Sequence, residues 1–209
     1  MRNAIIAGFA VVLVSTSLLF APDKKEGAAD QKKPSPEEMM AMMAKYGTPG
    51  EEHAKLKVME GTWDADVSCQ MDPSAPPMTS KGRMINKMVL GGRYLHGEYK
   101  GEFMGQPFEG LSVTGYDNAK KQYTMGWVDS MSTMIMMSTG SADSAGKVFT
   151  FKSTFDCPIE GRAKQMKQVI TIVDNDHHTF EMYDIQPDGK EVKGMTIKYT
   201  RAKNESAAR

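Results

Sequence analysis

Apolar and polar residues alternate along most of the chain from Gly61 onward. The first run places small or apolar side chains at every second position: Trp63, Ala65, Val67, Cys69 and Met71. A period of two is the pattern of a β-strand with one buried face. Turn signals such as Gly91-Gly92 and Pro187-Asp188-Gly189 then recur at short intervals, which indicates about eight to ten short antiparallel strands. Because a sheet of this size has edges to hide, we expect an all-β protein built as a single up-and-down β-barrel rather than a sandwich.

The residues before Gly61 have the spacing of helices instead. Ser35 precedes Pro36 and two glutamates, which is the sequence of a helix start, and Gly47 follows as a stop. Four methionines lie between these signals: Met39, Met40, Met42 and Met43. Thr48 and Glu51 stand at capping-box spacing and predict a second short helix that Gly61 ends. We therefore expect one or two short helices ahead of the barrel.

The first residues have the pattern of a targeting segment. Arg2 precedes the apolar run from Ala4 to Ala21, and charged residues begin at Asp23. This pattern predicts a signal peptide and an exported protein, periplasmic or extracellular. An uncleaved membrane anchor over residues 4–21 is the alternative, because the run approaches the length of a spanning helix. The chain then divides into four parts: a signal peptide or anchor (1–29), a flexible leader with the Met-rich helix (30–47), the barrel domain (48–203) and a disordered tail (204–209).

Composition narrows the classes of partner. Lys and Arg together number 26, and Asp and Glu together also number 26, so the formal net charge is zero. Nucleic-acid binding needs a clustered positive excess, so we expect no nucleic-acid partner. Contact with a membrane is expected only through an uncleaved leader. The pattern assigns no oligomeric state.

Cys69 and Cys157 are the only cysteines of the chain. In an exported protein they can form one disulfide that closes a long loop. The alternative is that both are small buried residues on separate strands. No Cys-x-x-Cys motif or Cys/His cluster is present, so no structural metal site is expected.

Methionine is unusually frequent, with 19 residues. One group, Met131, Met134, Met136 and Met137, lies in a strand-like stretch, and the other lies in the Met-rich helix. Thioethers are soft ligands that suit Cu(I), so bound copper is one hypothesis. On a strand, however, Met134 and Met136 face away from Met131 and Met137, so no single site collects all four. The alternative is that these methionines fill an adaptable core and an apolar docking surface.

The run from Tyr123 to Met131 holds the best candidates for a binding site. Met125, Trp127 and Asp129 share one face of a predicted strand. Asp129 is either a polar anchor in a ligand cavity or a cap for the following turn. The candidate apolar walls are Trp127, Met125, Met134, Met136 and Tyr183, and the candidate polar anchors are Asp129, His96 and Glu181. No nucleophile with an activating base stands in a recognisable motif, so no catalytic residue is assigned.

Residues at the two ends of the β-region indicate the kind of barrel. Gly61 and Trp63 open the first strand after a short helix, and Arg201 closes the last strand. In lipocalin-like barrels such a Gly-x-Trp packs beneath the barrel, with an Arg from the last strand across the indole, a cation–π contact. This position of the three residues favours a calycin-like barrel.

The chain also resembles a bacterial family known as domain of unknown function 1579, over about residues 50–203. The resemblance rests on Leu56-x-x-Met59-x-Gly61-Thr62-Trp63, Leu90-Gly91-Gly92-Arg93-Tyr94-Leu95, Gly105-Gln106-Pro107-Phe108-Glu109-Gly110, Gly115-Tyr116-Asp117, Trp127-Val128-Asp129-Ser130-Met131, Glu181-Met182-Tyr183, Lys193-Gly194-Met195 and Tyr199-Thr200-Arg201. It implies a calycin-like barrel and supplies no catalytic residues.

Three functions are compatible with these patterns. The favoured one is binding of a small apolar ligand inside the barrel, because a barrel of this strand number can enclose one small ligand. The second is a non-catalytic structural or interaction module of the cell envelope, with a filled barrel and the Met-rich helix as its docking element. The third is an enzyme or a redox protein with bound copper or haem.

Overall fold

The computed structural model describes residues 33–70, 74–158 and 160–203 of the chain. The predicted signal peptide or anchor (1–29) and the predicted tail (204–209) lie outside the described residues. The described strands are β1 (Gly61–Cys69), β2 (Met78–Val89), β3 (Tyr94–Phe103), β4 (Gln106–Asp117), β5 (Gln122–Asp129), β6 (Met136–Ala142), β7 (Val148–Cys157), β8 (Arg162–Ile172), β9 (His177–Ile185) and β10 (Glu191–Arg201). Three helical segments precede them: α1 (Pro36–Gly47), α2 (Glu51–Lys55) and the 3₁₀ helix η1 (Leu56–Met59).

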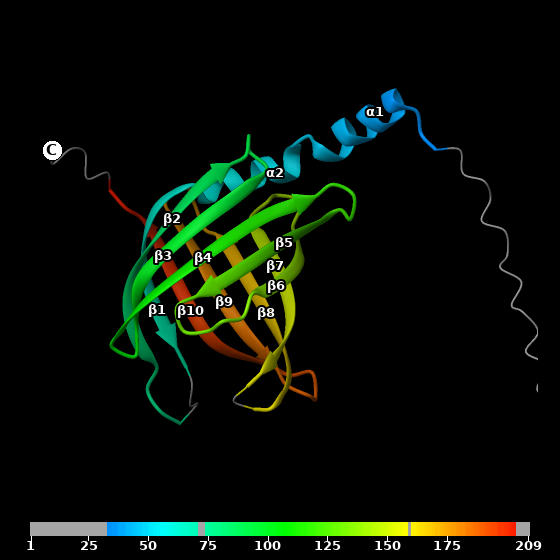
Figure 1. The fold of residues 1–209 in the computed structure, drawn as a ribbon. Helices are drawn as coiled ribbons and strands as arrows, with labels where there is room; N and C mark the ends of the chain where they lie inside the picture. Colours follow the sequence, from blue (N-terminus) through cyan, green and yellow to red (C-terminus); the bar gives the residue numbers. More distant parts are fainter. Residues whose placement is uncertain (1–32, 71–73, 159, 204–209) are drawn as a thin grey trace, which may run out of the picture.

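The ten described strands close into one antiparallel barrel (Figure 1). Each strand pairs with its neighbours in sequence, and β1 closes the barrel against β10. The prediction of a single up-and-down β-barrel is therefore confirmed. Closure pairs the first and last strands with each other, so neither is left as an open edge of the sheet.

Helix α1 begins as its sequence predicts. The Ser35 hydroxyl accepts a hydrogen bond from the Glu38 amide, and the Glu38 carboxylate accepts one from the Ser35 amide, which completes a capping box. None of its residues is buried, and Figure 1 shows α1 projecting away from the barrel. The predicted Met-rich helix is present, but it packs no face against the barrel.

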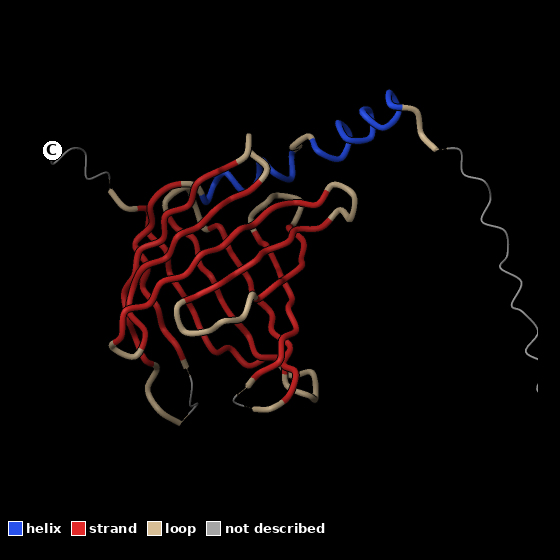
Figure 2. Tube along the Cα trace, in the orientation of Figure 1, coloured by secondary structure: helices blue, strands red, loops and turns tan. Residues whose placement is uncertain are grey.

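Helices α2 and η1 cover one end of the barrel, at the top of Figure 2. Leu56 and Met59 are buried there against side chains that point inward from the strands. We call this part the closed half; its buried cluster consists of Leu56, Met59, Leu95, Tyr123, Met125, Phe149, Phe151, Ile170 and Ile172. The Tyr123 hydroxyl donates to the Glu52 carbonyl oxygen at 2.8 Å, which ties α2 to β5.

Gly61, Trp63 and Arg201 meet where β1 and β10 pair. The Arg201 guanidinium lies 4.1 Å from the centre of the Trp63 ring, and it donates to the carbonyl oxygens of Glu60 and Asn175. Gly61 has a φ of +123°, and a Cβ at this position would lie 2.6 Å from Arg201 Nη1. Glycine is required here by both the backbone conformation and the space.

Candidate functional site

The end of the barrel opposite the helices is packed differently. We call it the open half; its inward-facing residues include Val67, Cys69, Phe108, Trp127, Met136, Phe155, Met166, Met182 and Met195. All of these side chains are half-buried, although they point into a closed barrel. An inward side chain of a closed barrel keeps accessible surface where solvent reaches it, so the interior of this half is open to solvent from the uncovered end, and we call this space the hollow. Val67, Phe108 and Trp127 also pack against a second buried cluster, which consists of Trp63, Ala65, Tyr99 and Tyr199.

Trp127 forms one wall of this hollow. Its indole lies flat over Gly110 of β4, where a Cβ would come within 2.3 Å of Trp127 Cζ2. Its ring also stacks with that of Phe108, with the ring centres 6.5 Å apart. Glycine at position 110 therefore makes the room that lets a large aromatic ring line the inner wall.

Asp129 makes the contacts of one of the two roles that the sequence left open, the cap of the following turn. Its Oδ2 accepts a hydrogen bond from Trp127 Nε1 at 2.9 Å, and its Oδ1 accepts one from the Met131 amide at 3.0 Å. The carboxylate thus caps the turn after β5 and fixes the orientation of the indole. Both oxygens are engaged by the chain itself.

Three polar side chains lie buried at the inner end of the hollow. Ser138 and Ser153 are directly paired across β6 and β7, and Gln168 lies diagonally from Ser153 on β8. Their exposed fractions are 1%, 6% and 2%, respectively. Both hydroxyls and Gln168 Oε1 have no hydrogen-bond partner among the described residues. We call these residues the polar row; leaving such a group buried and unpaired costs about 1–3 kcal/mol.

The amide nitrogen of Gln168 does have partners. It donates to the sulfur of Met136 at 3.4 Å and lies 3.9 Å from that of Met166. These weak acceptors fix the direction of the amide. The carbonyl oxygen Oε1 of the same side chain is the atom left unpaired.

The barrel wall is incomplete beside this site. Strand β7 pairs with β8 as far as Cys157, but it pairs with β6 only as far as Ser153. The loop over residues 130–135 is the tan segment between β5 and β6 in Figure 2, and together with the unpaired stretch of β7 it lines a hollow. A lateral hollow of about 790 Å³ lies there, lined by Ser130, Met131, Ser132, Thr133, Met134, Ile135, Thr154, Phe155, Asp156 and Pro158. Phe155 lines this hollow and, by the alternation of β7, belongs to the inner face of the barrel.

Lys164, at the rim of the open half, is paired with two carboxylates. Lys164 Nζ lies 2.7 Å from an Asp184 carboxylate oxygen and 2.6 Å from one of Glu160. These hydrogen bonds, that of Asp184 first, raise the pKa of Lys164. The lysine therefore stays charged and paired at the rim.

The structure divides the sequence-predicted site residues into two groups. Trp127, Asp129 and Met136 face the hollow, and Met134 lines the lateral hollow. Met125 also faces inward, but it is buried in the closed half and belongs to the core.

His96, Glu181 and Tyr183 do not line the interior, and their prediction as cavity residues is corrected here. On β9, buried His178 and core-packed Phe180 mark the inner face, so Glu181 and Tyr183 lie on the outer one. On β3, His96 alternates with buried Leu95 and Gly97 in the same way. Strand β9 carries an aromatic ring on each face, Phe180 on the inner one and Tyr183 on the outer one. The sequence alone therefore could not decide which face points into the barrel, because that is set when the barrel closes.

Glu181 and Tyr183 belong instead to an outer charged cluster. The Tyr183 hydroxyl donates to Glu181 Oε2 at 2.8 Å, and Lys193 Nζ lies 2.5 Å from Glu181 Oε1. The hydrogen bond from Lys193 has the largest effect on Glu181 and lowers its pKa, and the hydrogen bond from Tyr183 adds to this. The same hydrogen bond with Glu181 raises the pKa of Tyr183. Lys167 Nζ lies 4.6 Å from the centre of the Tyr183 ring. The cluster holds these four side chains to the outer wall.

Cys69 and Cys157 are free thiols on separate strands, so the possible disulfide is not present and the alternative that the sequence left open holds. They lie on β1 and β7, which are separated in the barrel by β10, β9 and β8. A disulfide requires Cα atoms within about 7 Å, whereas each strand adds about 4.8 Å across a sheet. Burial raises the pKa of the Cys69 thiol.

The methionine groups identified in the sequence do not converge. Met131 and Met137 are exposed, whereas Met134 and Met136 are half-buried. All four methionines of α1 are also exposed. Among the described residues, no group of three or more His, Cys, Asp or Glu side chains is arranged to hold a metal ion. Within the same residues, no helix has both the length and the apolar character needed to span a membrane.

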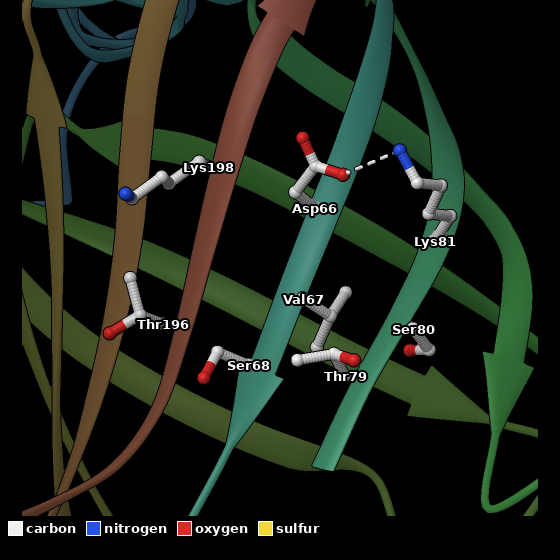
Figure 3. Close-up of a pocket in the computed structure, with 8 residues that line it drawn as sticks. All are labelled: Asp66, Val67, Ser68, Thr79, Ser80, Lys81, Thr196 and Lys198. Carbon is white, nitrogen blue, oxygen red and sulfur yellow. Dashed lines mark ion pairs between the residues drawn. The ribbon is translucent and has the colours of Figure 1, made fainter. Parts of the chain in front are cut away.

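A second hollow lies on the outer face of β1, β2 and β10 (Figure 3). It measures about 370 Å³ and is lined by Asp66, Val67, Ser68, Thr79, Ser80, Lys81, Thr196 and Lys198. Asp66 forms an ion pair with Lys81 at 3.1 Å, and both side chains are exposed. Because this ion pair is solvated and no buried polar group lines the hollow, it is the weaker candidate site.

The sequence analysis missed the polar row. Gln168 lies between Met166 and Ile170 on the apolar face of its strand, and Ser138 follows Met136 in the same way. A polar residue within an apolar alternation was the available signal. The unpaired state of these atoms, however, depends on neighbours from other strands.

Comparisons with known proteins agree with this architecture. Residues 48–201 match the family described as "Protein of unknown function (DUF1579)". Among solved structures, Rv2717c from M. tuberculosis is similar at a TM-score of 0.54 with 11% identity, over 75% of this chain and 100% of that one. The redesigned barrel mFAP1, solved bound to DFHBI, has a TM-score of 0.37 and 16% identity, over 70% of this chain and 98% of that one. No curated protein sequence matches the chain.

Proposed function

Because this chain belongs to the DUF1579 family, whose description assigns no activity, we propose a function from the site alone. The protein binds one small, uncharged, largely apolar ligand in the open half of the barrel. The polar row carries this proposal, because Ser138, Ser153 and Gln168 are buried and unpaired at the inner end of a hollow with apolar walls. Ligand pockets commonly combine such walls with a few convergent polar groups.

The polar row also restricts the chemistry of the ligand. Gln168 Oε1 only accepts hydrogen bonds, so it requires an N–H or O–H group on the ligand. The hydroxyls of Ser138 and Ser153 both donate and accept, so they can bind a neighbouring carbonyl or amine. The charged rim residues already pair with each other, and an unpaired charge beside the polar row would be costly to bury. The inner end of the ligand is therefore a neutral hydrogen-bonding group.

The neutral dye N-phenyl-1-naphthylamine tests this proposal, because it combines two aromatic groups with one N–H donor. We expect dye fluorescence to rise on binding and emission from Trp127 to be quenched. The variant Gln168→Leu keeps the side-chain volume but removes the acceptor, and it should weaken binding by up to about tenfold. The control variant Tyr183→Phe, on the outer wall, should bind the dye as the wild type does.

Two results would contradict the proposal. One is a dye that does not bind, and the other is equal binding by the wild type and Gln168→Leu. Circular dichroism of the variant separates loss of binding from loss of fold.

The natural ligand and the compartment are addressed by one further measurement. Native mass spectrometry of protein from an exporting host should show excess mass over the denatured sample, equal to that of a neutral organic molecule. We also propose export, on the pattern of residues 1–29, and the denatured mass tests it through cleavage of the leader.

A further inference from the structure

Sulfur-containing side chains are collected on the inner wall by strand pairing, not by closeness in sequence. Cys69 of β1 is directly paired with Met78 of β2 on one side and with Met195 of β10 on the other. Met195 is in turn paired with Met182 of β9. All four lie at inward-facing, half-buried positions of the open half.

We propose that Cys69, Met78 and Met195 form a binding site for Cu(I), with Met182 as an adjacent fourth sulfur. Directly paired residues in a sheet have Cβ atoms about 4.5–5.5 Å apart. The two methionine side chains are long and unbranched, so their sulfurs can reach toward the shorter cysteine between them. One thiolate and two thioethers make a soft ligand set, which suits Cu(I) better than hard cations.

The surroundings of the sulfurs favour a singly charged soft ion. The next inner layer toward the closed half is formed by Ser80, Val67, Ile197 and Phe180, which are directly paired in that order, and it is apolar except for the Ser80 hydroxyl. Binding of Cu(I) displaces the thiol proton of Cys69 to solvent. The resulting Cu(I)–thiolate pair has no net charge, so this layer imposes little penalty for burying it.

A bulge in β10 keeps a competing positive charge away from these sulfurs. The pairing of β10 with β9 shifts between Lys193 and Met195. Regular alternation from buried Tyr199 would place both Met195 and Lys193 inside the barrel. The bulge at Gly194 instead turns Lys193 to the outer face, where it pairs with Glu181. Bulges that redirect one side chain in this way are frequent beside functional sites.

The copper site lies in the same open half as the proposed ligand site, but it uses none of the residues of the polar row. Gln168 and the two serines of the polar row lie on β6, β7 and β8, whereas the three proposed copper ligands lie on β10, β1 and β2. Loss of dye binding in Gln168→Leu and loss of copper binding in a sulfur variant therefore test different statements.

Anaerobic titration of the full chain with Cu(I), in competition with bicinchoninate, tests the proposal. We expect one Cu(I) per chain. Cys69→Ser should weaken binding by at least about a hundredfold, because it removes a ligand itself. Loss of a residue that only hydrogen-bonds to a ligand usually weakens metal binding by about 10–100-fold. Met195→Leu preserves the side-chain volume and should weaken binding by about tenfold or more.

Two matched variants serve as controls. Cys157→Ser removes the other thiol, which also lies on an inner face but on β7, and Met137→Leu removes an exposed outer methionine. Both should bind Cu(I) like the wild type. The proposal is overturned if no Cu(I) binds in competition, if Cys69→Ser binds unchanged, or if Cys157→Ser loses as much affinity as Cys69→Ser. X-ray absorption at the copper edge should show only sulfur neighbours, and a shell of nitrogen or oxygen would also overturn it.

Discussion

The two halves of the barrel use the same strands for different purposes. In the closed half, helices α2 and η1 cover the end, and inward side chains such as Phe149 and Phe151 have no exposed surface. In the open half, Phe155 of the same strand and face remains half-buried. The closed half therefore supplies stability, and the open half keeps internal space and unpaired polar groups. A barrel can separate these tasks because strand pairing continues through both halves while the side-chain filling changes.

The largest expected effect is on the free energy of unfolding, when a phenylalanine on the inner face of β7 is replaced by alanine in one half or in the other. Phe149→Ala should lower the free energy of unfolding by about 3–5 kcal/mol, because it opens a cavity in a filled core. Phe155→Ala should lower it by only about 1 kcal/mol, because that ring is half-buried and its site already adjoins open space. Urea unfolding of both variants measures the difference. Equal losses would show that the open half is packed as tightly as the closed one.

A smaller effect is expected from pH, through a histidine of the filled interior. Burial and the nearby Arg201 lower the pKa of His178 from 6.5 to about 4. The unfolded chain therefore takes up this proton as the pH falls through 6.5, while the folded chain resists until about pH 4. The contribution of neutral His178 to the free energy of unfolding is therefore complete above pH 6.5 and is lost as the pH falls from 6.5 to about 4. At 1.36 kcal/mol per pKa unit, the loss is about 3 kcal/mol.

The variant His178→Phe tests this pH dependence. His178 stacks on Tyr199 at 4.5 Å and meets the edge of Trp63 at 4.3 Å, so a phenyl ring preserves the packing and removes the titration. The free energy of unfolding should decrease between pH 7.5 and pH 4.5 by less in the variant than in the wild type. Parallel decreases would exclude His178 as the source and leave the carboxylates.

The smallest expected effect has the opposite sign. Ser138→Ala and Ser153→Ala should each raise the free energy of unfolding by about 1 kcal/mol, because each removes a buried hydroxyl that has no partner. The dye N-phenyl-1-naphthylamine has no second polar group to pair with these hydroxyls, so both variants should bind it as the wild type does. Ser141→Ala, an exposed position on the same strand as Ser138, is the control and should change neither quantity. Destabilisation by the two inner variants would mean that these hydroxyls contribute to the fold.

Much of the fold could be predicted from residue patterns because strand alternation is a local property. The run from Trp63 to Cys69 and the turn signals are sufficient for antiparallel strands, and Ser35 with Pro36 marks the start of α1. Trp127, Asp129 and Met136 could be placed on a common inner surface for the same reason. His96 and Tyr183 could not, because both faces of their strands carry residues suited to a cavity.

The sequence by itself determined which side chains share a face of each strand, since a period of two places them there whatever the partner strand is. Only the tertiary structure decided which face is the inner one. It also decided which distant residues meet, because register and closure are set by pairing between strands. Cys69 and Met195 are neighbours only because β1 closes against β10, and Lys193 lies outside only because a bulge interrupts the alternation. The contrast between a filled and a hollow half arises in the same way, from helices that cover one end of a closed sheet.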